Sequence, residues 1–224
     1  MAVLTNIHRW VDTFLDFLQS THAPPHELPV VVSSTNPYPP RFILYNTEQL
    51  TRHNQLERVF AFTNNNPECA ELWDYSAANV RILAERGITA KHVPLRSSDS
   101  YVERLRSFQS AGQIYDVGFS GTRSARRSAI LDALKEKGHS VCLIQSWGEE
   151  RDVALAKCRI ILNIHYADDY NVFESARCVP WIEAGATVIS EHSLDDDPRC
   201  INVPYDQLVA ACSERLAQQP PAAS

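Results

Sequence analysis

Residues 116–147 read DVGFSGTRSARRSAILDALKEKGHSVCLIQSW, and this stretch decides the fold. The apolar run that ends in FSG predicts a strand, residues 124–137 predict a helix that Gly138 terminates, and SVCLIQSW predicts a second strand. The same alternation continues with a helix at 149–158, a strand at 159–166 (RIILNIHY), a helix at 172–184 that Gly185 terminates, a strand at 186–190 (ATVIS) and a helix at 205–217. Strands that alternate with helices need crossover connections, so we expect a parallel, Rossmann-like α/β sheet in this half of the chain.

The N-terminal half shows a weaker form of the same pattern. The expected elements are a helix of about four turns carrying Ile7, Trp10, Val11, Phe14 and Leu18, strands at 29–33 and 41–45, weaker strand candidates at 59–63 and 71–75, a helix from Ser76 to Gly87 and a strand at 92–95. A polar stretch at 96–113 separates the two halves. We therefore predict a reduced N-terminal α/β domain at 1–105, a C-terminal Rossmann-like domain at 106–217 and a disordered tail at 218–224.

Composition and charge exclude several classes of protein. The 224 residues include 44% hydrophobic and 21% charged residues, which excludes a disordered, collagen-like or coiled-coil chain. A formal net charge of −6 does not indicate general binding to nucleic acid or to an anionic membrane. The charged residues of the N-terminal segment argue against a signal peptide, and no stretch is long enough for a membrane span. The six cysteines have no CxxC spacing, so we expect free thiols and a cytoplasmic protein.

Three arginines lie at or near the start of the helix predicted after Gly121: Arg123, Arg126 and Arg127. Helix starts favour acids, because their unpaired N–H groups and the helix dipole are partly positive. Basic residues there are explained if an anion such as a diphosphate binds at that end, although solvated arginines on a surface helix are the alternative. The turn has neither the three glycines of a GxGxxG motif nor the GK[ST] of a Walker loop, which argues against a typical NAD or ATP site.

A second group of polar residues follows the strand at 159–166. His165 and Tyr166 come at its carboxyl end, and Glu174 and Arg177 stand three apart on the following helix. Ligands of open parallel sheets bind beyond the carboxyl ends of the strands, so Glu174 could accept the hydroxyls of a ribose and His165 could donate to a phosphate or a sugar hydroxyl. An intrahelical ion pair for Glu174 and Arg177, and a capping or packing role for His165, are the alternatives.

The segments FSGTRSARR, LNIHY and VFESARCVPWIEAGATVISEHS, together with YNTEQL and LWDYSAANVRILAERGITAKHVPL upstream, resemble GT-B-type glycosyltransferases related to bacterial group 1 enzymes and to CgeB-like proteins. The resemblance covers roughly residues 41–192. It implies two Rossmann-like domains, a nucleotide-sugar donor held mainly by the C-terminal domain, and no obligatory metal or other cofactor. By motif, Gly121 and Arg127 would face the diphosphate, while His165, Glu174 and Arg177 would line the donor pocket.

The paired glutamates of many GT-B enzymes are not reproduced here. Glu174 and Glu183 lie nine residues apart, on opposite sides of a straight helix, so Glu183 is expected to be structural. The candidate general bases are Glu48 and Asp74, which follow predicted strands of the N-terminal domain. A helix-start acid and a helix cap, respectively, are their alternative roles.

The prediction is a metal-independent glycosyltransferase that moves a sugar from a nucleoside diphosphate to an unknown glycan, protein or small-molecule acceptor. The short N-terminal half keeps a second possibility open, a non-catalytic nucleotide-sugar-binding module, and an unrelated Rossmann-like enzyme such as a methyltransferase is a third. The acidic runs at 168–169 and 195–197 are interpreted as solvated loops and not as metal sites.

Overall fold

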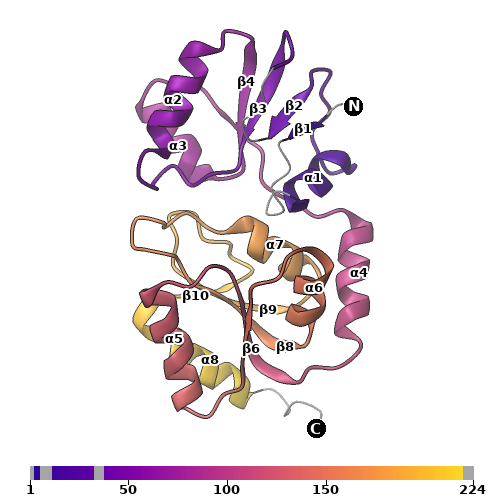
Figure 1. The fold of residues 1–224 in the computed structure, drawn as a ribbon, viewed down its shortest axis with the longest axis vertical. Coiled ribbons are helices and arrows are strands. Elements are labelled where there is room, and N and C mark those ends of the chain that lie inside the picture. The colour runs from indigo at the N-terminus through magenta and orange to yellow at the C-terminus, as the bar shows by residue number, and fades with distance from the viewer. Residues whose placement is uncertain (1–2, 6–11, 33–37, 219–224) are drawn as a thin grey trace. The chain divides into compact units, whose positions relative to one another are not determined.

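The computed structural model describes residues 3–5, 12–32 and 38–218 (Figure 1). The chain forms two compact units, one made of Met1–Ser98 with Asp169–Ala176 and the other of Asp99–Asp168 with Arg177–Ser224. Each unit contains a five-stranded parallel sheet, so the predicted Rossmann-like α/β fold is confirmed at this level. The predicted boundary at residue 105 falls inside helix α4 (Asp99–Gln109), which belongs to the second unit.

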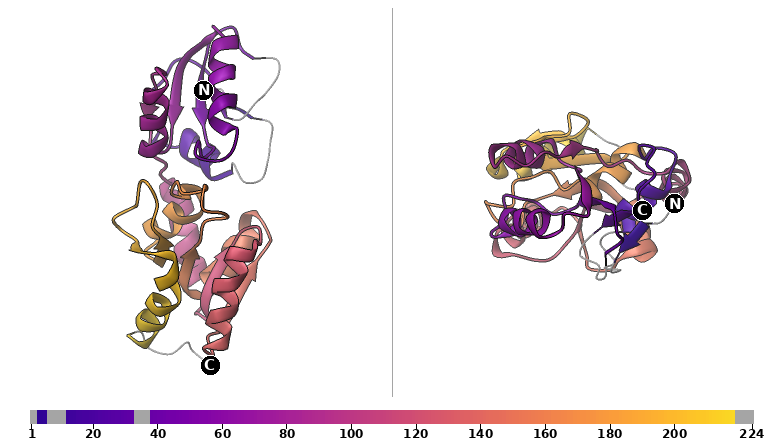
Figure 2. Two further views of the ribbon diagram at one scale, coloured as in Figure 1. Left: turned by 90° about the vertical axis from the view of Figure 1, so that its left-hand side faces the viewer. Right: turned by 90° about the horizontal axis from the view of Figure 1, so that it is seen from above.

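The first unit has the strand order β1-β2-β3-β4-β5. Its strands are β1 (Val3–Thr5), β2 (Val30–Val32), β3 (Phe42–Asn46), β4 (Cys69–Asp74) and β5 (Lys91–His92), and its helices are α1 (Asp12–Gln19), α2 (Gln55–Asn65) and α3 (Ala77–Glu85). Helices α2 and α3 lie side by side over one face of this sheet (Figure 2). The N-cap of α3 is Ser76, whose side chain accepts a hydrogen bond from the backbone N of Asn79, and not Asp74, for which the sequence had left a capping role open.

Two predictions for the first unit are wrong. The strand expected at 59–63 is part of α2, because Leu56, Val59 and Phe62 are three residues apart and pack on one core. Residues 3–5 form β1, although the expected elements included no strand at this end of the chain. Of the expected first helix, Phe14 and Leu18 lie in α1 and are buried, whereas Ile7, Trp10 and Val11 lie outside the described residues. The expected disordered tail also lies outside them from residue 219 onwards.

The second unit has the strand order β10-β9-β8-β6-β7. Its strands are β6 (Tyr115–Ser120), β7 (Val141–Ile144), β8 (Cys158–Asn163), β9 (Thr187–Glu191) and β10 (Ile201–Val203). Its helices besides α4 are α5 (Ala125–Glu136), α6 (Gly148–Ala156), α8 (Leu208–Ala217) and most of α7 (Ser175–Glu183). Helices α5 and α8 cover one face of the sheet, and α4 packs with α6 on the other (Figure 1). Strand β10, with three residues, is not among the elements expected from the sequence.

The strand order places a topological switch point between β6 and β8. Numbered in chain order within this unit, the strands run 2-1-3-4-5 across the sheet. The chain leaves β6 toward β7 on one side, and it leaves β8 toward β9 on the other. In such sheets the crossover helices diverge at this point and leave a crevice outside the carboxyl ends of the two strands. Any ligand of this unit is therefore expected beside Gly121 and His165.

Gly118, in the middle of β6, cannot carry a side chain without rearrangement. A Cβ atom there would lie 2.5 Å from Sγ and 2.9 Å from Cβ of Cys158. Glycine at this position therefore lets the side chains of Cys158 and Leu155 pack closely against the backbone of β6.

All six cysteines are free, as expected from their spacing, and Cys158, Cys178 and Cys212 are buried. Burial raises the pKa of Cys212 to about 12, which keeps its thiol protonated at neutral pH.

A charged cluster ties the amino ends of three strands together. Asp116 accepts hydrogen bonds from the backbone N (2.8 Å) and Oγ (2.9 Å) of Ser140 and from Nη1 of Arg159 (2.9 Å). Burial raises the pKa of Asp116, but the hydrogen bonds from Ser140 and Arg159 outweigh burial and hold the pKa below its ordinary value of 3.8. The carboxylate therefore stabilises the folded state.

We expect Asp116→Asn to lower the free energy of unfolding by about 1 kcal/mol at neutral pH. Because the folded-state pKa is depressed, this contribution is complete above pH 3.8 and is lost as the pH falls through the folded-state pKa. Urea unfolding of both proteins between neutral pH and about pH 2 measures the effect. A difference in stability that stays constant over this range would contradict the assignment.

Within the described residues, none of the helices has the length and apolar character that crossing a membrane requires.

Candidate functional site

The carboxyl ends of β6 and β8 bring together two arginines of the second unit. Arg127, in the first turn of α5, is buried and donates from Nε to Ile164 O (2.9 Å) and from Nη1 to Thr122 O (2.9 Å). Arg177, in α7, donates from Nη1 to Oδ1 of Asn163 (2.7 Å). These three acceptors fix the planes of the two guanidinium groups.

Both guanidinium groups converge on Gly121, directly after β6. Gly121 has a φ of 154°, and a Cβ atom there would lie 3.1 Å from Nη2 of Arg177, 3.4 Å from Nη1 of Arg127 and 3.2 Å from Cζ of Phe119. The Phe119 ring centroid lies 5.2 Å from Cζ of Arg127 and 5.3 Å from Cζ of Arg177. We call Gly121, Arg127 and Arg177 the arginine cradle. It presents two cations at the point where parallel sheets bind ligands.

Asn163 positions one arginine of the cradle, Arg177, through a hydrogen bond. It is fully buried at the end of β8, its Oδ1 accepts from Arg177, and its Nδ2 donates to Oγ of Ser190 (2.9 Å). The Ser190 hydroxyl in turn donates to Glu191 O (2.8 Å). This chain of hydrogen bonds orients the Asn163 amide with its oxygen toward Arg177.

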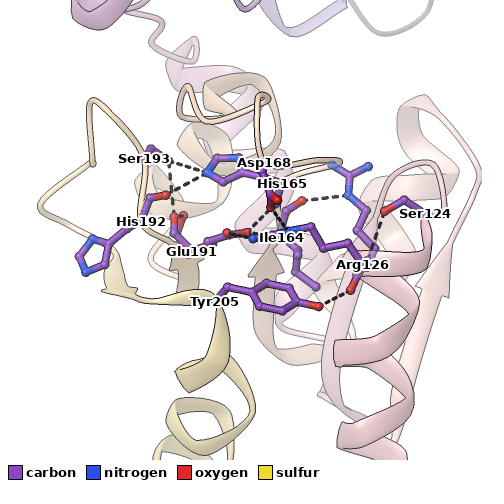
Figure 3. Close-up of polar contacts among 11 residues, drawn as sticks. Ser124, Arg126, Ile164, His165, Asp168, Glu191, His192, Ser193 and Tyr205 are labelled. Atoms are coloured by element: carbon purple, nitrogen blue, oxygen red, sulfur yellow. Dashed lines mark hydrogen bonds and ion pairs between the residues drawn. The ribbon is translucent and has the colours of Figure 1, made fainter. Parts of the chain in front are cut away.

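Arg126 belongs to a different cluster, drawn in Figure 3. Its guanidinium forms a two-point ion pair with Glu191, including an Nη1–Oε2 contact of 2.6 Å, and its Nε donates to Asp168 (2.9 Å). The same group stacks 3.8 Å from the centroid of the Tyr205 ring. Burial lowers the pKa of Arg126, but the bonds to Glu191 and Asp168 raise it overall. Arg123 is exposed, with Nε 3.4 Å from Oγ of Ser128.

His165 is buried at the carboxyl end of β8 and is held at two points (Figure 3). Its backbone N donates to Glu191 Oε2 (3.0 Å), and its ring Nε2 lies 3.0 Å from His192 O and 3.2 Å from Oγ of Ser193. Because a carbonyl oxygen only accepts, Nε2 carries the hydrogen. His165 is therefore not arranged to deprotonate Ser193, and the two do not form a nucleophile–base pair.

Tyr166 follows His165 at the same edge of the sheet. It is partly exposed, and its ring centroid lies 5.4 Å from Cζ of Arg127. The structure thus brings Gly121, Arg127, His165, Tyr166 and Arg177 of the predicted donor-binding residues into one unit at one sheet edge, while Arg126 is paired with carboxylates.

Glu174 belongs to the first unit, not to the unit that holds Arg177. Its Oε1 accepts from Nε2 of Gln49 (2.8 Å), and Oε1 of Gln49 accepts from the backbone N of Val172 (3.2 Å). A contact between Glu174 and a ribose stays a prediction. Glu183, expected to be structural, has a carboxylate oxygen 3.8 Å from a guanidinium nitrogen of Arg199.

The two candidate bases have different surroundings in the first unit. Asp74 is 0% exposed and accepts from Asn46 Nδ2 (2.6 Å), Ser76 N (2.8 Å) and Asn79 Nδ2 (3.0 Å), an arrangement that favours a structural role. Glu48 is half-buried and pairs with Arg52 (3.4 Å). Burial raises the pKa of the Glu48 carboxyl, Arg52 opposes the rise, and the Glu174 carboxylate adds to it.

No group of three or more His, Cys, Asp or Glu side chains within the described ranges could hold a metal ion. The acidic loop residues have other partners: Asp168 pairs with Arg126, Asp196 with His192 (2.6 Å) and Asp197 with Arg199 (2.6 Å).

Sequence reasoning missed two site residues, Asn163 and Glu191. Glu191 lies directly after the predicted strand at 186–190, so the rule that singled out His165 would have found it there too. Asn163 is a polar residue in the otherwise apolar run IILNI, which marks a buried amide that needs partners.

The relatives of this chain include three proteins of Acanthamoeba polyphaga mimivirus. The chain is 35% identical over 173 residues to "Uncharacterized protein L140" (76% of this chain, 54% of that protein), 37% identical over 155 residues to "Uncharacterized protein L137" (68% and 20%), and 30% identical over 186 residues to "Uncharacterized protein R358" (79% and 62%). The chain thus spans about half of the first of these relatives and a fifth of the second. No protein-family model and no solved structure matches the chain.

Proposed function

We propose that the arginine cradle binds the diphosphate of a nucleotide sugar and that the protein is a metal-independent glycosyltransferase of GT-B type. The observation that carries the proposal is the convergence of Arg127 and Arg177 on Gly121 at the β6–β8 switch point. A Cβ atom at residue 121 would lie 3.1 Å from Arg177 and 3.4 Å from Arg127, so only glycine leaves both guanidinium groups unobstructed at this turn.

The local chemistry suits a diphosphate. Helix α5 begins at Ala125, so its unpaired N–H groups and the positive end of its dipole lie at the same sheet edge as the cradle. Planar guanidinium groups recognise phosphate oxygens through paired hydrogen bonds. When a sugar is transferred, negative charge develops on the departing nucleoside diphosphate. Fixed cations at that position would stabilise the charge in the transition state without a metal ion.

Glu48 is the better of the two candidate bases. Its raised pKa moves the carboxyl closer to neutral pH, where a general base is most effective. Asp74, in contrast, is fully buried and already accepts three hydrogen bonds. The acceptor that Glu48 would activate is a glycan, a protein or a small molecule with a free hydroxyl.

We expect Arg177→Met to weaken binding of nucleoside diphosphates by about 10- to 150-fold, because one charge-assisted hydrogen-bonding group is lost. Isothermal titration calorimetry with uridine, guanosine and adenosine diphosphates measures the affinities. Lys135→Met, at the far end of α5, removes an equal charge from an exposed pair with Asp132 and should leave the affinities unchanged. Equal losses in both variants would indicate a general charge effect and count against the cradle.

The alternative is a nucleotide-sugar-binding module without catalysis. The surroundings of Asp74 favour this alternative: the carboxylate is fully buried and already accepts three hydrogen bonds, so Glu48 is left as the one candidate base. Release of the nucleoside diphosphate from nucleotide sugars, measured with and without an acceptor library, separates the two functions, because both transfer and hydrolysis release it. Turnover that Glu48→Gln abolishes supports the transferase. Tight nucleotide binding without turnover supports the module.

A further inference from the structure

Two cysteines of the second unit, Cys142 and Cys158, approach each other across strand β6. They belong to β7 and β8, which pair with β6 on either side. Cys158 is buried, and its Sγ donates to Ala154 O (3.4 Å), whereas Cys142 is partly exposed. The proposed function uses neither thiol, so the pair raises a separate question about the chemistry of this unit.

Gly118 is the residue of β6 that lets the two sulfur atoms come together. The Cys158 sulfur lies 2.5 Å from the position that a Cβ atom of residue 118 would take, so it fills the space of the missing side chain. Gly118 is paired with Cys142 in the register of β6 and β7. Paired residues of neighbouring parallel strands direct their side chains to the same face of the sheet, and the strands lie about 4.8 Å apart. The Cys158 sulfur therefore lies beside the Cys142 side chain.

The surroundings of the two thiols differ. Burial raises the pKa of both, but a hydrogen bond from Cys158 and the charge of Lys157 oppose the rise in the pKa of Cys142. The neighbouring Cys142 instead raises the pKa of Cys158 further. Reaction with a dissolved oxidant needs both exposure and thiolate character, so it begins at Cys142.

We propose that Cys142 and Cys158 form a reversible disulfide when a peroxide attacks, and that this bond staples β7 to the start of β8. In the first step the Cys142 sulfur attacks a peroxide oxygen and the O–O bond breaks. Hydrogen peroxide then yields a Cys142 sulfenic acid and one water, which carries the thiol proton. In the second step the Cys158 sulfur attacks the Cys142 sulfur, the S–O bond breaks, and the hydroxide leaves as water with the Cys158 proton. The peroxide accepts the electron pair that the thiols lose, and a dithiol reverses the reaction.

The bond closes a loop between residues 142 and 158, which restricts the unfolded chain more than the folded one. We expect the oxidised protein to melt about 5 °C higher than the reduced protein, and dithiothreitol to reverse this rise.

The test treats the full chain with hydrogen peroxide, then alkylates the remaining thiols under denaturing conditions and maps the peptides by mass spectrometry. Two of the six thiols should be lost, and Cys142 should be linked to Cys158. Cys200→Ser is the matched control, because Cys200 is also partly exposed and also lies in the second unit; this variant should form the same link. In Cys158→Ser the reaction should stop at the Cys142 sulfenic acid, which dimedone traps.

The pair is overturned if peroxide leaves both thiols open to alkylation, oxidises Cys142 without linking it to Cys158, or links Cys142 to another cysteine. A bond between Cys142 and Cys158 that does not raise the melting temperature overturns the staple. In Cys142→Ser, Cys158 should stay reduced. Its oxidation in that variant would contradict the order of the two steps.

Discussion

Gly121→Val is expected to reduce the affinity for nucleoside diphosphates by at least about 100-fold, the largest loss of binding among the predicted variants. The first atom of the new side chain would meet both guanidinium groups and the Phe119 ring at 3.1–3.4 Å. The φ of 154° adds strain, because residues with a Cβ rarely adopt it. Both arginines would have to move, so the charge-assisted bonds from each are weakened together. Calorimetry with uridine diphosphate and with pyrophosphate measures the loss.

Gly138→Ala is the matched control for this experiment. Gly138 ends α5 with a φ of 86°, and a Cβ atom there would meet nothing within 4 Å. This variant should lower the melting temperature through backbone strain and keep the native affinities. If Gly121→Val binds nucleotide normally while its stability falls, the space above Gly121 is not the anion site.

Asp152→Ala should cost about 3–5 kcal/mol of unfolding free energy, the largest expected loss of stability. Asp152 in α6 is 1% exposed and accepts from Arg151 Nε (2.9 Å) and Nη2 (2.8 Å) and from the Tyr101 hydroxyl (3.0 Å). The Tyr101 hydroxyl also accepts from Nη2 of Arg151 (3.0 Å). These bonds join α4 to α6. Removing the carboxylate leaves a largely buried guanidinium without its counter-charge, and total stabilities are only about 5–15 kcal/mol.

Urea denaturation followed by circular dichroism measures this loss, with Asp132→Ala as the comparison. Asp132 forms an exposed pair with Lys135 (3.2 Å), and its removal should cost less than about 1 kcal/mol. Tyr101→Phe, which keeps the ion pair, should lie between the two. Similar small losses for Asp152→Ala and Asp132→Ala would show that the buried pair does not hold α4 to α6.

The sequence predicted the second unit more fully than the first, for a physical reason. Each strand there is an apolar run bounded by polar residues, and Gly138 and Gly185 adopt the positive φ that ends a helix. In the first unit, the residues VFAFT at 59–63 are of types that favour strands. In the structure, however, Leu56, Val59 and Phe62 pack on the core with the three-residue spacing of a helix. This spacing cannot be distinguished from that of a strand in so short an apolar run, so the folded core is needed to decide between them. Strand β10 is held by a single neighbouring strand, and three residues carry no readable periodicity.

The candidate site was predictable in position but not in detail. The residues that follow the predicted strands include Gly121 and His165, and the topological switch point lies between the two strands that precede them, β6 and β8. The sequence could not distinguish Arg126 from Arg127, because neighbouring residues on a helix point about 100° apart and either could face the crevice. Tertiary contacts determine which arginine belongs to the cradle: Arg126 donates to the Glu191 carboxylate, whereas Arg127 donates to the backbone oxygen of Ile164.

The segment Asp169–Ala176 gives this protein an unusual genetic architecture. It is encoded far downstream of Ser98 yet belongs to the first unit, where Gln49 makes its two side-chain hydrogen bonds to Val172 and Glu174. No single crossover in the gene can exchange either unit intact. A recombinant that joins residues 1–98 to a foreign partner leaves the buried Gln49 amide without those two bonds. Substitutions at 169–176 must therefore remain compatible with residues encoded about 120 codons earlier.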